Sequence, residues 1–277
     1  MRKILCAFVI MAAFCGSALS EDFSSSIMNF NDSLTHDEAG KEWTPSGDPV
    51  LSSTQSISGG KSLYLDGNSY LQAQNTQPFD LPEEFTLEAW IYPQQFVTDH
   101  YGGATFTVFS RWLHGVRTLY LVNIDKVDDN NGRISFYSDF NGAVSVVSES
   151  TIPLNKWTHI AVTRDSEKVI RVFINGKLDG EKKITHDFTS TDYSMTIGAS
   201  SNAMRKSVGY IDDWHVYKKC MYTNNFTVSH RTESKPASSK NEVYSIADEI
   251  RKFKSLLDDG IITQEEFDAA KKKLLGL

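Results

Sequence analysis

The sequence predicts a mainly β protein: a two-sheet antiparallel sandwich followed by a short α-helical hairpin at the C-terminus. From Ser62 to Tyr217 the chain is a succession of short runs rich in Val, Ile, Thr, Phe and Tyr, separated by turn residues. Asn-Gly pairs at 131–132, 141–142 and 175–176 supply the positive φ that tight hairpins need. Because no run of comparable length in this stretch has a helical period, we expect two sheets that bury their apolar sides against each other.

The first twenty residues have the three parts of a signal peptide. Basic Arg2 and Lys3 precede an apolar run from Ile4 to Phe14, and small residues then form a cleavage site. The apolar run is shorter than the roughly 20 residues that a membrane-spanning helix needs. We therefore expect residues 1–20 to be removed and the mature chain, without a membrane span, to be secreted or periplasmic.

Composition limits the class of partner. The chain has 277 residues, 40% of them hydrophobic, which is enough for one large or two smaller domains with a core. Its net charge of −7 argues against a nucleic acid as partner, because neutralising a row of phosphates requires basic residues. Only one of its three cysteines, Cys220, lies beyond the predicted signal peptide, so the mature chain can form no internal disulfide.

Five segments carry a family resemblance. In order they are SLYLDGNSYL, FTLEAWIYP, WTHIAVTRDSEKVIRVFINGKLDG, MTIGA and YIDDWHVYKKCMYTNNFT. Their order and spacing resemble the concanavalin A-like, laminin G-like jelly roll from about Ser58 to Val228. The resemblance implies a jelly-roll sandwich over residues 21–228, with a lead-in at 21–57. This fold serves lectins, glycosidases, adhesion modules and structural domains, so it implies no single activity.

The sequence does not favour catalysis. Relatives that hydrolyse glycans carry paired carboxylates on one strand, whereas Glu88 is the single acid of its strand and is expected at an outward position. A second carboxylate within about 5 to 9 Å of Glu88 in a cleft would revive a hydrolase. The seven histidines have no metal-binding spacing, and we predict no catalytic residue.

The resemblance suggests calcium, with Asp66 and Asp212 at the matching positions. On a straight strand Asp212 shares a side with Trp214 and Val216, so its carboxylate would face the apolar side and need donors or a cation. Oxygen ligands of this kind suit Ca²⁺. The alternative is that Asp66 only forms an Asp-Gly turn and that Asp212 accepts backbone N–H bonds where a bulge starts.

A second acidic segment, residues 123–133, is better explained as a hairpin tip. The side chains that could gather around a cation are Asp125, Asp128, Asp129 and Asn131, but Val127 occupies the first-ligand position of an EF-hand frame. We expect a solvated turn there.

Ligand-binding candidates surround the Gly102-Gly103 pair. Tyr101, Trp112 and His114 could stack on a sugar and hydrogen-bond its hydroxyls, although Trp112 could instead belong to the core. Three further tryptophans are expected to be scaffold residues: Trp90, Trp157 and Trp214.

A polar linker at 229–241 precedes a helical hairpin at 242–277. Gly260 ends the first helix, and Thr263 with Glu266 forms the capping box of the second. The segment imitates half of an EF-hand, but Ser255 and Leu257 fall where two ligands are required. The apolar stripes of the two helices contain Ile246, Ile250, Phe253, Leu257, Phe267 and Leu274.

The tail resembles the SHOCT (short C-terminal) domain of bacterial proteins over EIRKFKSLLDDGIITQEEFDAAKKKLL. The resemblance implies oligomerisation or interaction. A hairpin of about 30 residues buries too little apolar surface to be stable alone, so we expect it to pair with a second copy or a partner. The alternative is that it packs on its own sandwich.

Three functions follow from these features. The leading hypothesis is a secreted, non-catalytic recognition module for a carbohydrate or cell-surface ligand, calcium-assisted and made multivalent by its tail. The alternative is a structural or assembly protein of an envelope or virion, with the sandwich as spacer. A glycoside hydrolase ranks last because the paired carboxylates are missing.

Overall fold

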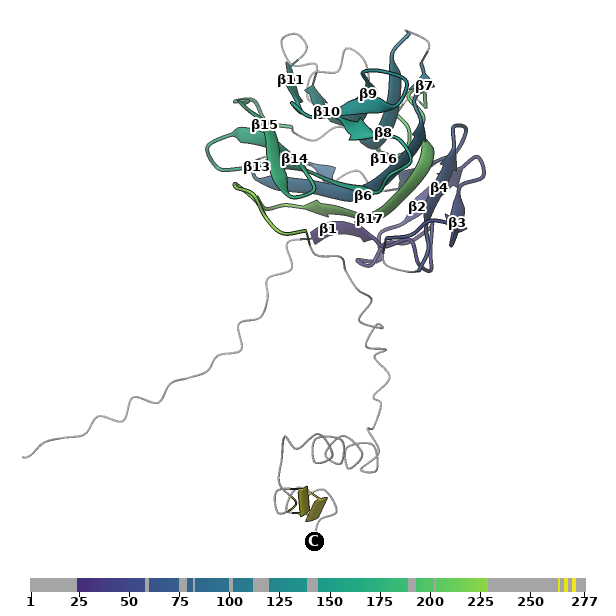
Figure 1. Cartoon of the computed structure of the whole chain (residues 1–277), viewed down its shortest axis with the longest axis vertical. Coiled ribbons are helices and arrows are strands. Elements are labelled where there is room, and N and C mark those ends of the chain that lie inside the picture. The colour runs from purple at the N-terminus through teal and green to yellow at the C-terminus, as the bar shows by residue number, and fades with distance from the viewer. Residues whose placement is uncertain are drawn as a thin grey trace, which may run out of the picture. The chain divides into compact units, whose positions relative to one another are not determined.

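The computed structural model describes most of the sandwich and a few residues of the tail (Figure 1). The described residues are 24–57, 60–74, 79–81, 83–99, 102–111, 120–138, 144–188, 193–201 and 203–228, with 264, 267, 268, 271 and 272. The chain divides into two compact units, Met1–His230 and Arg231–Leu277. The predicted linker, 229–241, spans this division.

The first sheet is antiparallel and forms the lower layer of the sandwich in Figure 1. β17 pairs with strands that are distant in the sequence: its first half pairs with β4, and its last residues pair with β1. In spatial order the sheet contains β15 (Lys177–Lys183), β14 (Val169–Ile174), β13 (Thr158–Arg164), β6 (Phe85–Gln95), β17 (Val208–Tyr217), β4 (Ser62–Asp66) and β3 (Val50–Ser52), with β1 (Ser24–Met28) on β17.

The second sheet is also antiparallel, and its strands β8 to β11 lie above the first sheet in the same view. Its spatial order is β11 (Val144–Val147), β10 (Asn131–Ser138), β9 (Tyr120–Lys126), β8 (Ala104–Arg111), β16 (Thr196–Ile197), β5 (Tyr70–Ala73) and β2 (Trp43–Ser46), with β12 (Ile152–Pro153) on β10 and β7 (Val97–Thr98) on β8. The predicted antiparallel sandwich is therefore confirmed.

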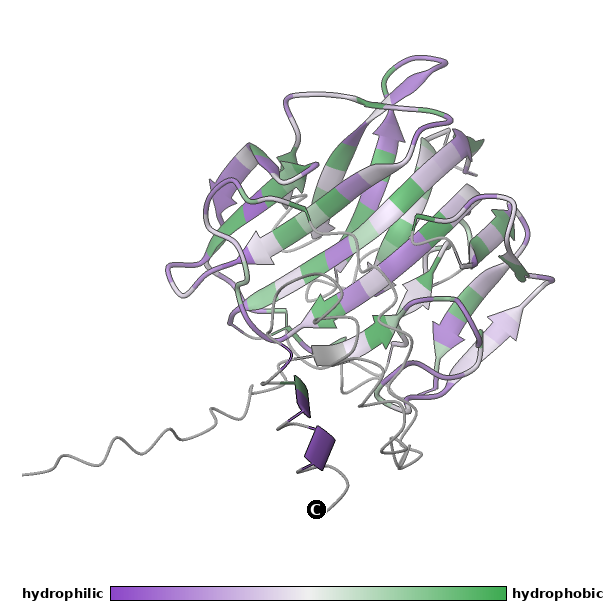
Figure 2. Cartoon of the chain, turned by 60° about the horizontal axis from the view of Figure 1, so that its bottom comes forward, coloured by the Kyte–Doolittle hydropathy of each residue, from purple (hydrophilic) through white to green (hydrophobic). Residues whose placement is uncertain are grey.

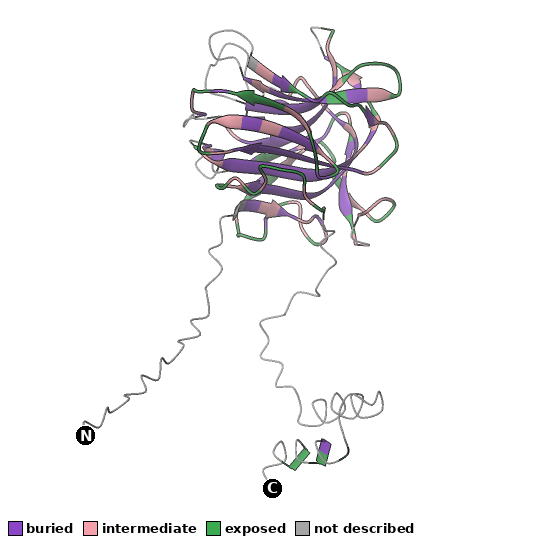
Figure 3. Cartoon of the chain, turned by 60° about the vertical axis from the view of Figure 1, so that its left-hand side comes forward, coloured by how far each residue is buried: buried purple, intermediate pink, exposed green. Residues whose placement is uncertain are grey.

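The core lies between the sheets and follows from the two-residue period of the strands. Phe106 of β8, Ile124 of β9 and Ile134 of β10 point inward and are fully buried. Figure 2 shows the hydropathy alternating along the strands, and Figure 3 shows that the interior strands are largely buried. Each such side chain contributes about 1.5 to 3 kcal/mol of burial free energy, which supports a sandwich without a disulfide.

Trp214 is the centre of the core, as expected. Its ring stacks on Phe109 at 4.8 Å and meets Trp43 edge-on at 5.4 Å between ring centroids. Its indole N–H donates to the carbonyl oxygen of Val108 at 3.2 Å. Trp90 is also buried, at 8% exposed, but register places it on the outer face of the first sheet instead of between the sheets. Trp157, just before β13, is half-buried on the same face.

A β-bulge overturns the straight-strand expectation for Asp212. Asp212 pairs with Trp90 across β17 and β6, whereas His215 pairs with Glu88, so one extra residue lies between them. Asp213 takes a φ of 43° at this bulge. The bulge turns Asp212 to the outer face while Trp214 and Val216 keep their core positions, so Asp212 does not share their side.

In the tail, the described residues 264, 267, 268, 271 and 272 are helical, and Phe267 is buried. They fall in the second predicted helix. The other predicted hairpin residues lie outside the described part of the chain: Ile246, Ile250, Phe253, Leu257 and Leu274. Among the described residues, no helix has the length and hydropathy to cross a membrane.

Candidate ligand-binding hollow

A hollow of about 520 Å³ lies over the outer face of β8, β9 and β10. Its position matches the segment that the sequence singled out, since Gly102 and Gly103 form part of its rim. The predicted ligands Tyr101, Trp112 and His114 themselves lie outside the described residues. The lining contains Gly102, Gly103, Ala104, Thr105, Asp125, Lys126, Val127, Tyr137 and Arg205.

Strand register brings the polar side chains of the hollow together. Thr105 of β8 pairs with Asp125 of β9, and Asn123 of β9 pairs with both Thr107 of β8 and Ser135 of β10. These residues alternate with the core positions, so they share the outer face. The Thr107 hydroxyl donates to Asn123 Oδ1 at 3.0 Å. The result is a floor of hydroxyl, amide and carboxylate groups.

A tight loop forms one rim. Gly103 N donates to Asp99 Oδ1 at 2.9 Å, and Asp99 N donates to the Gly103 carbonyl at 2.7 Å. Gly102 has a φ of 83°, which favours glycine, and a Cβ on Gly103 would lie 3.2 Å from Asp99 Oδ2. Arg205 Nε lies 3.1 Å from the same Asp99 oxygen. The glycine pair therefore serves to close this loop on a buried carboxylate.

Asp125 is the acidic group of the hollow. Burial raises the pKa of its carboxyl, while hydrogen bonds from Ser135 and Asn123 and the charge of Arg205 act in the opposite direction. The half-buried Tyr137 ring lines the same hollow. A carboxylate and amides that hydrogen-bond hydroxyls, next to an aromatic ring that can stack on C–H groups, are suited to a polyhydroxylated ligand.

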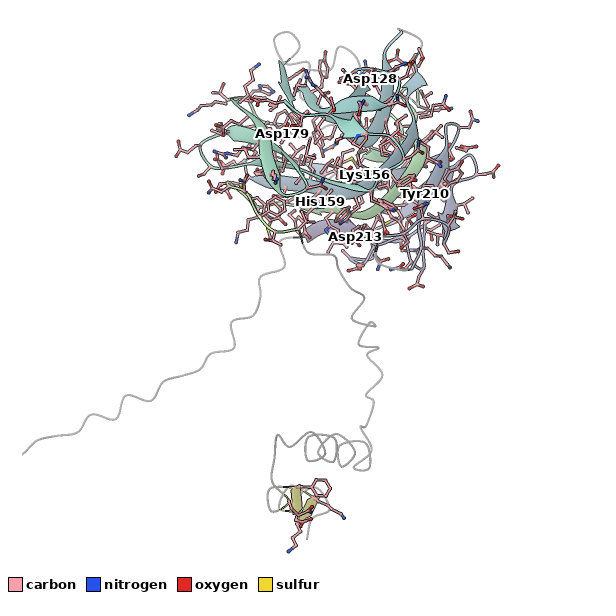
Figure 4. The ribbon with its side chains drawn as sticks, in the orientation of Figure 1. Asp128, Lys156, His159, Asp179, Tyr210 and Asp213 are labelled. Carbon is pink, nitrogen blue, oxygen red and sulfur yellow. The ribbon has the colours of Figure 1, made fainter. Side chains whose placement is uncertain are left out.

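Sequence reasoning assigned Asp125 to a solvated hairpin tip, and that assignment is wrong for this residue. Asp125 is a half-buried residue of β9, whereas Asp128 is exposed at the tip and accepts from Asn130 N at 2.8 Å. Asp128 marks this hairpin near the top of Figure 4. Asn123 and Asp125 are two residues apart, as side chains on one face of a strand are, and this spacing could have assigned Asp125 to the strand instead of the turn.

The structure does not bring Asp66 and Asp212 together. Asp66 pairs with Val208, and Asp212 lies four residues further along β17, roughly 13 Å away at the usual strand rise. Asp66 Oδ1 accepts from Asn68 N at 2.8 Å and from Ser69 N at 2.9 Å, which are the bonds of a turn. The described residues contain no group of three or more His, Cys, Asp or Glu side chains arranged for a metal ion.

Asp212 is instead bound by backbone donors. Its carboxylate accepts from Ile57 N at 3.0 Å and from Asp213 N at 2.9 Å. Burial nevertheless raises the pKa of Asp212 to about 7. Backbone N–H groups of a turn and of a bulge therefore donate to the two carboxylates, which is the arrangement expected if neither residue binds calcium. A Ca²⁺ ion at either carboxylate would need further ligands.

Glu88 lies on the outer face of the first sheet, as predicted, but it is buried rather than exposed. His215 Nδ1 lies 3.3 Å from Glu88 Oε1, and His159 Nε2 lies 3.6 Å from Glu88 Oε2. The segment after β17 covers it, since the Tyr222 hydroxyl also bonds Glu88 and the Phe226 ring meets His159 at 5.9 Å. Among the described residues, Glu88 thus contacts His159, His215 and Tyr222, whereas glycan hydrolysis uses a second carboxylic acid.

Two family models match the chain. Residues 65–225 match the model described as the concanavalin A-like lectin/glucanases superfamily, and residues 248–275 match the short C-terminal domain. Both predicted resemblances are confirmed. No protein with a curated description matches the chain.

Solved structures share the fold at low identity. Domain 4 of AbnA, a GH43 extracellular arabinanase from Geobacillus stearothermophilus, in complex with arabinotriose, has a TM-score of 0.55 and 19% identity, covering 72% of this chain and 94% of that one. The botulinum neurotoxin serotype G binding domain has a TM-score of 0.53 and 16% identity, covering 72% and 48%. The binding domain of botulinum neurotoxin DC, in complex with rat synaptotagmin II, has a TM-score of 0.54 and 15% identity, covering 73% and 49%. This chain spans about half the length of the toxin domains.

Proposed function

Since the chain belongs to the concanavalin A-like lectin/glucanase superfamily, we propose that it is a secreted, non-catalytic recognition protein that binds carbohydrate in the hollow over β8, β9 and β10. The single observation that carries the proposal is the hollow itself: a concave space in which Asp125, Thr105 and Tyr137 converge. The arabinotriose complex of the AbnA domain supports carbohydrate as the ligand class.

The chemistry of the hollow favours a neutral or hydroxyl-rich ligand over an anionic one. The net charge of −7 repels an acidic sugar, and Asp125 adds to that repulsion when it is ionised. Arg205 is engaged by Asp99 and serves to hold the rim. The buried, histidine-bound Glu88 on the opposite sheet supports the non-catalytic part of the proposal.

In this proposal the tail, residues 242–277, makes the protein multivalent for its ligand. A short C-terminal domain that pairs with a second copy would place two or more hollows in one particle, and weak single-site binding then becomes useful avidity. Calcium assistance remains a prediction that titration with Ca²⁺ and a chelator would test.

A glycan array tests the proposal. The mature chain, labelled and applied at several concentrations, should bind one class of neutral glycan, and Tyr137→Ala should lose that signal while keeping the folded circular-dichroism spectrum. An array without specific binding by the folded chain would reject carbohydrate recognition and favour a structural or assembly role.

A further inference from the structure

A row of aromatic side chains crosses the outer face of the first sheet, on the side of the sandwich opposite the hollow. Tyr64 of β4 pairs with Tyr210 of β17, and Tyr210 pairs in turn with Tyr92 of β6. Trp157, just before β13, continues the row, because its ring meets that of Tyr92 at 5.6 Å. These four residues are called the aromatic row. In Figure 4, Tyr210 lies toward the lower side of the sandwich and Asp128 toward the top.

The row is regular because strand register builds it. Neighbouring strands lie about 4.8 Å apart, so side chains in direct register repeat at that spacing. The ring centroids of Tyr64 and Tyr210 are 4.9 Å apart, and those of Tyr210 and Tyr92 are 5.9 Å apart. Successive planes are turned by 45°, 79° and 59°, so the row presents ring faces and ring edges along one line.

The row keeps solvent contact where other parts of this face are covered. Tyr64, Tyr92 and Trp157 are half-buried, whereas Tyr210 between Tyr64 and Tyr92 is 7% exposed, so the three outer members supply most of the accessible surface. Val50, opposite Tyr64 on the edge strand β3, is 49% exposed. In contrast, the segment after β17 covers Glu88, and the backbone N–H of Ile57 and the hydroxyl of Ser56 donate to Asp212.

We propose that the aromatic row is a second carbohydrate site, which takes a neutral, linear polysaccharide lying across the strands. Pyranose rings present C–H faces that stack on aromatic rings and hydroxyls that hydrogen-bond the phenol groups at their edges. A linear polymer repeats these features along one line, as the row does. A single sugar or a globular ligand would use only part of it.

Charge selects a neutral polymer. The row consists of tyrosine and tryptophan side chains, which are uncharged at neutral pH, and the chain as a whole carries a net charge of −7. An acidic polysaccharide therefore finds no basic partner among the four rings and only Lys156 at one end, and it meets the repulsive field of the whole chain. Exposed Lys156, next to Trp157, and half-buried Gln94, on the same face two residues beyond Tyr92, add hydrogen-bond donors at one end.

Affinity electrophoresis tests the proposal. The full chain is run through native gels that contain a neutral β-glucan, xylan or mannan, with polygalacturonate as the acidic comparison. We expect retardation by at least one neutral polymer and none by polygalacturonate. The double substitution Tyr92→Ala with Trp157→Ala should raise the apparent dissociation constant about tenfold or more, since two stacking rings are lost.

Matched variants separate this site from the hollow and from misfolding. Tyr193→Ala removes a 37% exposed tyrosine outside the row and should leave retardation unchanged. Asp125→Asn alters the hollow and should also retain binding to the row. Tyr92→Phe keeps the ring and should lose only part of the affinity, which makes the test valid even if the double variant unfolds.

Three retardation results would overturn the proposal: no retardation of the wild-type chain by any neutral polymer, unchanged retardation of the folded double variant, or retardation that Asp125→Asn alone abolishes. The proposal would also be overturned if the double variant changed its oligomeric state without any change in glycan binding, because the row would then be a protein interface.

Discussion

Arg205 Nε lies 3.1 Å from Asp99 Oδ2, and this pair fastens the loop at 99–103 to the rim of the hollow. The side chain of Asp99 is 1% exposed and that of Arg205 is 25% exposed. The acid therefore depends on the guanidinium and on Gly103 N for its stability in a buried position. The two residues come from loops about a hundred positions apart, so the rim forms only when the sandwich is complete.

Arg205→Ala should loosen this rim. Removing the cation leaves the buried Asp99 carboxylate with less compensation, at a cost of about 1 to 3 kcal/mol in unfolding free energy. Thermal melts and glycan titration should show a lower midpoint and weaker binding. Lys177→Ala, which removes an exposed cation of β15 in the other sheet, is the control and should change neither. An Arg205→Ala chain with wild-type stability would contradict the role assigned to the pair.

Asp212 should make folding stability depend on pH. Its folded pKa is about 7 and its ordinary value is 3.8, so the folded state binds a proton more tightly than the unfolded state. Its contribution to stability is therefore present below about pH 4 and is lost as the pH rises toward 7. Asp212→Asn should gain stability over the wild type across that window, on the order of 3 kcal/mol at its upper end.

Denaturant unfolding of both chains at pH 4.5 and 7.5 measures this difference. Comparing the pair of chains removes the contributions of other acids, such as Asp66, whose folded pKa is lowered chiefly by the Asn68 N–H bond. A difference between the two chains that stays constant with pH would refute the assignment to Asp212.

Glu88→Gln should affect stability without affecting glycan binding. Burial by itself raises the pKa of Glu88, but the hydrogen bond from His215 and the charges of His215 and His159 outweigh burial and lower it. The carboxylate thus stabilises the fold above its ordinary pKa of 4.5, and this is lost as the pH falls through the lower folded value. At pH 7 the substitution should cost about 1 to 3 kcal/mol.

The same variant tests the proposal that the protein is not catalytic. Neither the wild-type chain nor Glu88→Gln should release reducing ends from a bound polysaccharide. Hydrolysis by the wild type that disappears in Glu88→Gln would return the chain to the hydrolase class.

Deleting residues 242–277 should convert a multimer into a monomer. Light scattering coupled to size exclusion measures the mass, and soluble oligosaccharide titration should give the same single-site affinity for both forms. Binding to a glycan-coated surface should weaken in the truncated chain, because avidity is lost. Equal masses for the two forms would contradict self-association and would make the tail a candidate for binding a different protein.

Strand alternation made the sandwich predictable. Phe106, Ile124 and Ile134 occur at the inward positions of runs that also carry turn residues at their ends, so both the strands and their buried sides were readable. The family resemblance and the helical tail were likewise readable from ordered motifs.

Local irregularity and distant packing were not predictable. The bulge at Asp213 reversed the side of Asp212, since one extra residue changes the parity of everything before it. Asp125 could not be separated from the neighbouring turn acids, because its partners Arg205 and Ser135 come from other strands and loops. The aromatic row depends on the register of four separate segments, which no single stretch of sequence contains.

Titration calorimetry of the folded chain with the neutral oligosaccharide selected by the array tests carbohydrate recognition by the hollow most directly. Asp125→Asn and Tyr137→Ala should each weaken binding about tenfold or more, whereas Asp128→Asn, three residues away at the exposed hairpin tip, should bind as the wild type does. Wild-type affinity in both hollow variants, with their folds intact, would contradict the account.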